Sequence, residues 1–153
     1  MHSVTVFLIV AGSFSVVLVP VLVFGVFLRR RYIRLRDSIN QHWKPSSILM
    51  SNANSFGQES LGVKQVRGNG IIVLTNSEVY FEMLMPKKSW TIPVSSIQAV
   101  ENPTSHLGKT RGIPLLKVVF QNQQGAIDSI VWQIHDVSIW TKTLQEMIQK
   151  KDF

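Results

Sequence analysis

The sequence predicts one transmembrane helix followed by a small, mainly β domain that a single C-terminal helix closes. Residues 4–28 carry no charged side chain, five arginines follow them, and after Pro45 short β-branched and aromatic runs alternate with turn residues. The 153 residues leave enough chain after the anchor for one hydrophobic core. We therefore expect a transmembrane anchor at residues 1–28, a basic juxtamembrane helix or linker at 29–45 and a β domain at 46–153.

The apolar segment at residues 4–28 is long enough to cross a membrane. At about 1.5 Å per residue it would measure ~37 Å as a helix, against a hydrocarbon core of ~30 Å. A cleaved signal peptide is the rival interpretation, but it would carry its basic residues before the apolar stretch, which would itself be only ~7–15 residues long. A buried core helix fits less well, because no polar face interrupts the segment. We expect an uncleaved anchor that Pro20 kinks.

The charge distribution predicts the orientation of this anchor. The formal net charge is +7, but five of the sixteen basic residues lie in residues 29–36, where there is no acidic residue. Basic residues that flank a span stay on the cytoplasmic side, so the N-terminus should lie outside and the C-terminal domain in the cytoplasm. The rest of the chain holds eleven basic against nine acidic residues, which argues against a nucleic-acid partner.

The basic juxtamembrane segment should continue the helix as far as Trp43, because apolar and aromatic residues recur on one of its faces and Pro45 follows. Two interpretations of its arginines remain open. They act only as a stop-transfer signal, or they contact anionic lipid headgroups as a polybasic patch. The arginines are Arg29, Arg30, Arg31, Arg34 and Arg36.

Seven short runs after Pro45 have the composition of strands. We expect them at residues 48–56, 71–74, 79–84, 89–94, 97–100, 115–120 and 126–134, with a polar loop at 102–114. Gly57, Gly62, Gly68 and Gly70 are expected to mark turns after the first strand. Asp136 is expected to cap a final helix whose apolar residues share one face, namely Val137, Trp140, Leu144, Met147 and Ile148. The predicted fold is an all-β sandwich or barrel plugged at one end by this helix.

Three sequence segments resemble the core of GRAM and bacterial pleckstrin-homology-like (PH-like) domains. They are residues 70–75 (GIIVLT), 79–81 (VYF) and 92–97 (IPVSSI), and the closing helix with Trp140 and Leu144 is similar as well. The resemblance covers about residues 46–150. It implies a PH-like seven-strand sandwich or barrel closed by one C-terminal helix. It also implies a binding module for lipid headgroups or peptides, in which lipid-binding members concentrate basic residues between the first two strands. Here that region holds Lys64 and Arg67.

No catalytic, cofactor-binding or metal-binding residues are expected. The chain has no cysteine, its four histidines are scattered, and no nucleophile or phosphate-binding motif occurs. We therefore expect a protein that is not an enzyme.

Two basic pairs complete the candidate lipid-contacting residues: Lys87 with Lys88, and Lys109 with Arg111. Either they are simply solvated or, with the arginines, they form one electropositive surface. The expected function is a membrane-anchored adaptor at the cytoplasmic face that engages lipid headgroups or a protein partner. The alternative is an accessory or assembly subunit of a membrane complex, recognised through its transmembrane helix.

Overall fold

The computed structural model describes residues 2–150, with side chains from residue 19 onward. The chain divides into two compact units, Met1–Ser38 and Ile39–Phe153. Within the part of the chain whose side chains are described, no helix is apolar over a length that could cross a membrane. The span expected at residues 4–28 falls largely on residues 4–18, whose side chains lie outside that part.

The first element is the long helix α1, His2–Trp43, which contains Pro20. Residues 29–43, which the sequence predicts to follow the membrane span, are helical to the end of this element. The helix stops there because Pro45 cannot donate a backbone hydrogen bond. Ser46 and Ser47 then donate side-chain hydrogen bonds to the last carbonyls, Ser46 Oγ to Trp43 O at 3.2 Å and Ser47 Oγ to Lys44 O at 3.1 Å.

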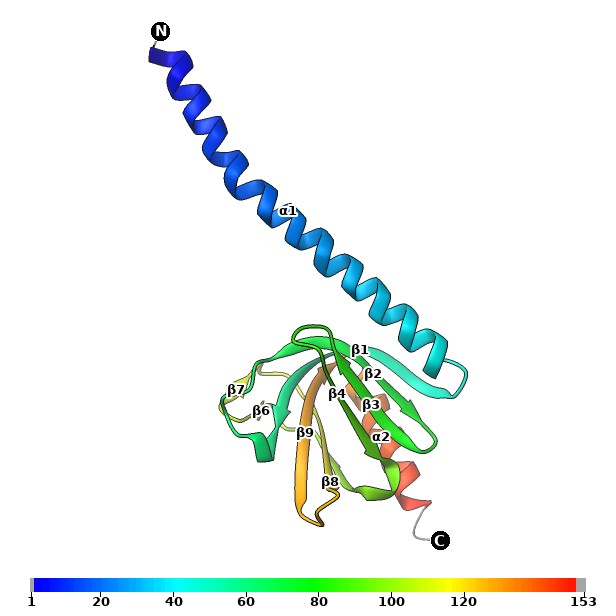
Figure 1. Ribbon diagram of the computed structural model, residues 1–153. Helices are drawn as coiled ribbons and strands as arrows, with labels where there is room; N and C mark the ends of the chain where they lie inside the picture. Colours follow the sequence, from blue (N-terminus) through cyan, green and yellow to red (C-terminus); the bar gives the residue numbers. More distant parts are fainter. Residues whose placement is uncertain (1, 151–153) are drawn as a thin grey trace. The chain divides into compact units, whose positions relative to one another are not determined.

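The second unit contains a seven-stranded antiparallel sheet with the strand order β4-β3-β2-β1-β9-β8-β5 (Figure 1). Its strands are β1 Ser47–Gln58, β2 Gly68–Thr75, β3 Glu78–Met83, β4 Lys88–Pro93, β5 Ile97–Glu101, β8 Leu116–Gln121 and β9 Ile127–Ile134. The short elements are the 3-10 helices η1 Glu59–Leu61 and η2 Val94–Ser96 and the strands β6 Ser105–His106 and β7 Lys109–Thr110. With the C-terminal helix α2, Val137–Gln149, this confirms the expected architecture of seven strands and a closing helix.

Strand β1 connects the two halves of the sheet. Its first part, from Ser47 to Ser55, pairs with β2, and its last part, from Ala53 to Gln58, pairs with β9. The register with β9 shifts between Ser55 and Gly57, where Gly57 has a φ of 110°. A bulge of this kind bends a strand and increases its twist, so β1 can serve both halves of the sheet.

The core lies between the sheet and α2. Alternate residues of the strands face it, including Ile72 and Leu74 of β2 and Phe81 of β3, and Trp132 of β9 is fully buried there. Trp140 and Leu144 of α2 join this cluster, and Val137, Met147 and Ile148 pack against it. The apolar face predicted for the final helix is therefore confirmed.

Two predictions about local structure are wrong. Gly57 lies inside β1, and Gly68 and Gly70 lie inside β2, so these three mark no turn. A Cβ at Gly70 would lie 2.1 Å from the Glu82 carbonyl oxygen of β3. Glycine is needed there for close approach between strands. Asp136 precedes α2 but adopts a left-handed conformation with a φ of 53°, and its side chain makes no capping bond. Its carbonyl oxygen instead accepts from Ile139 N at 3.0 Å.

The last turn of α1 belongs to the second unit. Ile39 is 2% exposed, and Trp43 stacks on Tyr80 of β3. Ile71 and Val73 of β2, whose side chains alternate with those facing the core, are buried as well. The structured unit therefore begins before the first strand.

Candidate functional site

The structure places the predicted basic residues in both units. Arg29, Arg30, Arg31, Arg34 and Arg36 lie on α1 in the first unit. Lys87 and Lys88 belong to the β3–β4 hairpin, and Lys109 and Arg111 to the connection between β5 and β8, all in the second unit.

The two lysines of the β3–β4 hairpin have different neighbours. Lys87 Nζ lies 3.7 Å from Glu82 Oε1, but its side chain is 75% exposed, so this pair contributes little to stability. Lys88 Nζ lies 4.7 Å from the centre of the Trp90 ring. Both lysines are exposed and can contact an anionic surface.

Lys109 has a structural contact. Its ammonium group donates a 2.8 Å hydrogen bond to the carbonyl oxygen of Gln65, in the loop between β1 and β2. This bond joins the β6–β7 hairpin to that loop, so the two segments lie side by side, as Figure 1 also shows. Arg111, after β7, is exposed. Of Lys109 and Arg111, Arg111 is therefore the cation more available to contact an anionic surface.

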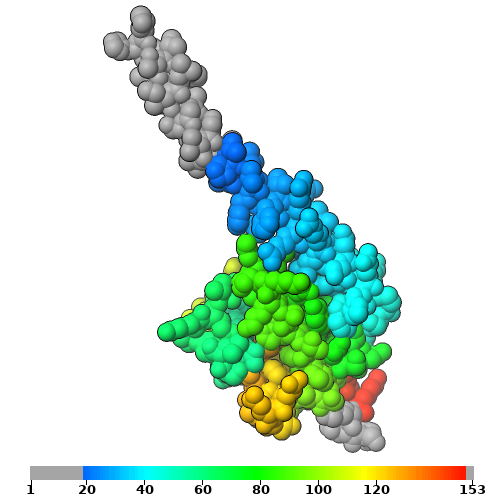
Figure 2. Space-filling view, in the orientation of Figure 1, coloured from blue at the N-terminus to red at the C-terminus, as the bar shows by residue number. Residues whose placement is uncertain are grey.

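The β1–β2 loop, residues 59–67, carries a feature that our sequence reasoning missed. Leu61, Val63 and Val66 are exposed, at 51%, 63% and 69% of their surfaces. Lys64 is exposed between them, and the Arg67 guanidinium lies 4.0 Å from the centre of the Phe56 ring. The loop projects from one side of the second unit, where it is coloured turquoise in Figure 2. The signal was present in the sequence as three aliphatic residues between Gly57 and Gly68.

Gln65 holds this loop in shape. Its side-chain nitrogen donates to the carbonyl oxygens of Gln58 and Gly62, at 2.6 Å each, and its side-chain oxygen accepts from Gln58 N at 2.9 Å. The exposed aliphatic side chains are therefore carried on a loop that its own hydrogen bonds order.

A buried carboxylate supports the base of the loop. Asp128 of β9 accepts hydrogen bonds from Gln58 Nε2 at 2.5 Å, from both the backbone nitrogen and the hydroxyl of Ser60 at 3.0 and 2.5 Å, and from Ser129 N at 2.8 Å. Burial by itself raises the pKa of Asp128, but these hydrogen bonds outweigh it and hold that pKa below its usual range. Asp128 is therefore ionised at neutral pH, which fixes Gln58.

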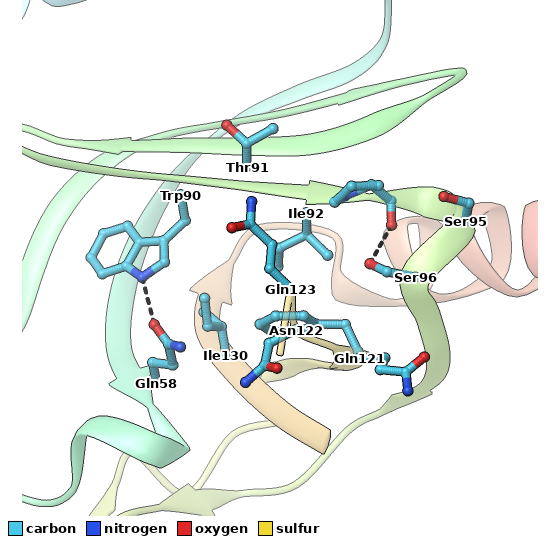
Figure 3. Close-up of a pocket in the computed structure, with 12 residues that line it drawn as sticks. Gln58, Trp90, Thr91, Ile92, Ser95, Ser96, Gln121, Asn122, Gln123 and Ile130 are labelled. Carbon is cyan, nitrogen blue, oxygen red and sulfur yellow. Dashed lines mark hydrogen bonds between the residues drawn. The ribbon is translucent and has the colours of Figure 1, made fainter. Parts of the chain in front are cut away.

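A cavity of about 620 Å³ lies between β4 and the β8–β9 hairpin (Figure 3). Ile92, Phe120 and Ile130 supply apolar surface, while Thr91, Gln121 and Gln123 are among the polar residues that line it. Among the described residues that line it, none is charged. Figure 3 shows Gln123 extending from the hairpin toward Thr91.

The cavity has an ordered end wall. Trp90 Nε1 donates a 3.0 Å hydrogen bond to Gln58 Oε1, and Gln58 is held in turn by Asp128. Sequence reasoning missed this cavity because single Gln, Asn, Ser and Thr residues in turns form no recognisable motif.

Within residues 19–150 no group of three or more histidine or acidic side chains is placed to hold a metal ion. His106 of β6 is buried, and burial is the main reason that its pKa lies below the usual value.

No protein-family model and no curated protein match this chain. Among solved structures, it is similar to the C-terminal domain of an unknown protein from Leishmania infantum, with 11% identity, a TM-score of 0.49 and coverage of 83% of this chain and 98% of the other. It is also similar to human RhoA in complex with the DH/PH fragment of PDZRHOGEF (11% identity, TM-score 0.46) and to Vav1 inhibited by an allosteric inhibitor (9%, 0.46). These two matches cover 69% and 67% of this chain, which spans 29% and 26% of theirs.

Proposed function

We propose that this protein is a membrane-tethered, PH-like binding module whose β1–β2 loop and β3–β4 hairpin contact acidic lipid at the cytoplasmic face. The observation that carries the proposal is the exposed trio Leu61, Val63 and Val66 beside exposed cations. Aliphatic side chains on an ordered loop gain free energy by leaving water, and neighbouring lysines gain it near anionic headgroups.

The magnitudes describe a weak module that depends on its tether. Full burial of a Val or Leu side chain gives roughly 1.5–3 kcal/mol, so shallow insertion of three gives about 3 kcal/mol together. Each cation near an anionic surface adds up to ~1 kcal/mol. The sum corresponds to an affinity between millimolar and micromolar. A tether that keeps the domain near the bilayer makes such an affinity effective, because it raises the local concentration.

The tether and its orientation are part of the proposal, supported by the uncharged residues 4–28 and the arginines after them. The chain contains no cysteine, so a single introduced thiol reports its own position. Gln124→Cys in the exposed β8–β9 turn should react with a membrane-impermeant thiol reagent only after cells are lysed. Reaction in intact cells would contradict the cytoplasmic location.

Vesicle binding by the second unit alone, residues 39–153, tests the function without the anchor. We expect sedimentation with phosphatidylserine-containing vesicles, little with pure phosphatidylcholine, and weakening as salt rises. The triple variant Leu61→Ser, Val63→Ser, Val66→Ser should lose binding at every salt concentration.

Charge-matched variants provide the control. Lys87→Glu with Lys88→Glu should abolish the preference for acidic vesicles, whereas Lys142→Glu on α2 with Lys150→Glu directly after it should leave the preference nearly unchanged. If the unaltered fragment ignores acidic vesicles even at low salt, the lipid-contact proposal fails, and recognition through the N-terminal helix becomes the better hypothesis.

A further inference from the structure

Strand β4 has one free edge. It is the first strand in the order of the sheet, and within residues 2–150 it pairs only with β3, so the backbone groups on its other side have no strand partner in that part of the chain. That free edge borders the cavity, because residues 90–93 form one of its walls. An exposed strand edge is a template for adding another strand.

The register shows which backbone groups are available. Val94 N donates to Ser77 O at 2.8 Å, directly after the pair formed by Glu78 and Pro93. Hydrogen-bonded and non-hydrogen-bonded pairs alternate along an antiparallel ladder. Ile92 and Trp90 therefore bond to β3, whereas Thr91 turns its N–H and C=O toward the free edge. Pro93, which has no N–H to donate, falls in the non-hydrogen-bonded class, as this assignment requires.

The wall of the cavity opposite β4 also suits an added strand. Gln123 presents a side-chain amide, which can both donate and accept hydrogen bonds. Gln121 Nε2 already donates to Gly125 O at 2.9 Å, and Asn122 Oδ1 accepts from Gln124 N and Ala126 N, so these two side chains offer Gln121 Oε1 and Asn122 Nδ2. Beneath them, Ile92 and Ile130 provide apolar surface for a side chain that points inward. Since no residue that the structure describes in the lining is charged, an ionised ligand would lose its hydration there without gaining a counter-ion.

We propose that this cavity binds an extended, uncharged polypeptide segment, which adds to the sheet as a strand beside β4 and places an apolar side chain over Ile92 and Ile130. The site is separate from the lipid-contacting loop and uses hydrogen bonds rather than charge. Its recognition rests on the backbone of Thr91 on one side and on the amide side chains of the β8–β9 hairpin on the other.

The test uses the full-length protein in detergent micelles and a capped hexapeptide of alternating threonine and valine. We expect saturable shifts of the backbone amide resonances of β4 and residues 121–123, with an affinity that salt leaves unchanged. A second peptide, N-methylated at alternate residues, cannot form the ladder and should bind at least about tenfold more weakly, which corresponds to ~1.4 kcal/mol. Equal binding of the two peptides would overturn the proposal.

Two pairs of variants locate the site. Thr91→Pro removes the free N–H while keeping the bonds to β3 and should weaken peptide binding at least about tenfold, whereas Thr91→Val keeps the N–H and should bind as before. Gln123→Trp in the exposed turn should fill the cavity and abolish binding, whereas Gln123→Ala removes one hydrogen-bonding amide and should weaken binding less. If Thr91→Pro fails to fold, the Gln123 pair decides the question.

Two further outcomes would contradict the proposal. If the protein without peptide forms a dimer whose β4 amides are already protected from exchange, the occupant is a second copy of the chain. If no shift in β4 saturates at any soluble peptide concentration, the cavity does not bind an extended segment.

Discussion

The indole of Trp43 stacks on the phenol ring of Tyr80, with ring centroids 4.8 Å apart and an interplanar angle of 25°. Trp43 is the last residue of α1, and Tyr80 lies in the middle of β3. Tyr80 Oη also donates a 2.7 Å hydrogen bond to Glu82 Oε2. Burial, followed by that hydrogen bond and the charge of Glu82, raises the pKa of Tyr80 to about 12. The end of α1 is therefore held against the sheet by the packing of Trp43 on Tyr80, in addition to its covalent connection to β1.

Replacing Trp43 by alanine in the fragment 39–153 should lower the free energy of unfolding by about 1–3 kcal/mol, because a partly buried aromatic contact is lost. Tyr80 is the single tyrosine of that fragment, so alkaline absorbance titration reports it alone. Its pKa should fall from about 12 toward about 10 in Trp43→Ala, since the phenol becomes more exposed.

Trp43→Phe is the matched control, because it keeps an aromatic ring over Tyr80. It should retain most of the stability and most of the raised pKa. If Trp43→Ala changes neither quantity, the last turn of α1 is not part of the folded unit, and the domain begins at β1.

The strands could be predicted because their signals are local. Residues 71–74 are a β-branched and aliphatic run, and the turn at Asn76 and Ser77 follows directly, so β2 and β3 were found. The helix α2 was found for a similar reason, because Trp140 and Leu144 repeat at helical spacing. These patterns depend on the period of one element and need no knowledge of its neighbours.

The errors concern contacts between distant residues. Gly70 was assigned to a turn because glycine is common in turns, but it is required by the approach of Glu82, on another strand. Lys109 bonds to the backbone of Gln65, 44 positions earlier, and its sequence neighbours do not indicate this. The cavity beside β4 likewise combines Gln58, Trp90 and Gln123 only after folding.

Acidification should destabilise the fragment 39–153 partly through His106. Its pKa is lowered chiefly by burial, and the positive charges of Lys117 and Lys109 lower it further. The negative charge of Glu59 raises this pKa, but by less than burial lowers it. Because the folded-state pKa lies below the unfolded value of about 6.5, stability is full above that value and is lost as pH falls through the folded pKa.

Chemical denaturation between about pH 5 and pH 7.5 checks this expectation. His106→Gln should show a smaller loss of stability on acidification than the unaltered fragment, and the carboxylates contribute equally to both. His135→Gln is the control for the substitution itself, because it replaces a histidine whose side chain is 91% exposed. If His106→Gln and the unaltered fragment have parallel pH profiles, His106 is not neutral in the folded state.

Asp128→Asn should destabilise the fragment by about 1.5–3 kcal/mol, because an amide nitrogen would face groups that donate to the carboxylate from Gln58, Ser60 and Ser129. The pKa of Asp128 is lower in the folded state than the unfolded value of about 3.9. The ionised carboxylate therefore stabilises the fold above that value, and this stabilisation is lost as pH falls through the folded pKa. Asp128→Asn lacks this group and should lose less stability in acid than the unaltered fragment. Hydrogen exchange of the backbone amides of residues 60–67 should accelerate in Asp128→Asn.

Asp136→Asn, whose exposed side chain makes no capping bond, should change stability by less than about 0.5 kcal/mol. Equal effects of the two substitutions would show that the Asp128 network does not support the β1–β2 loop.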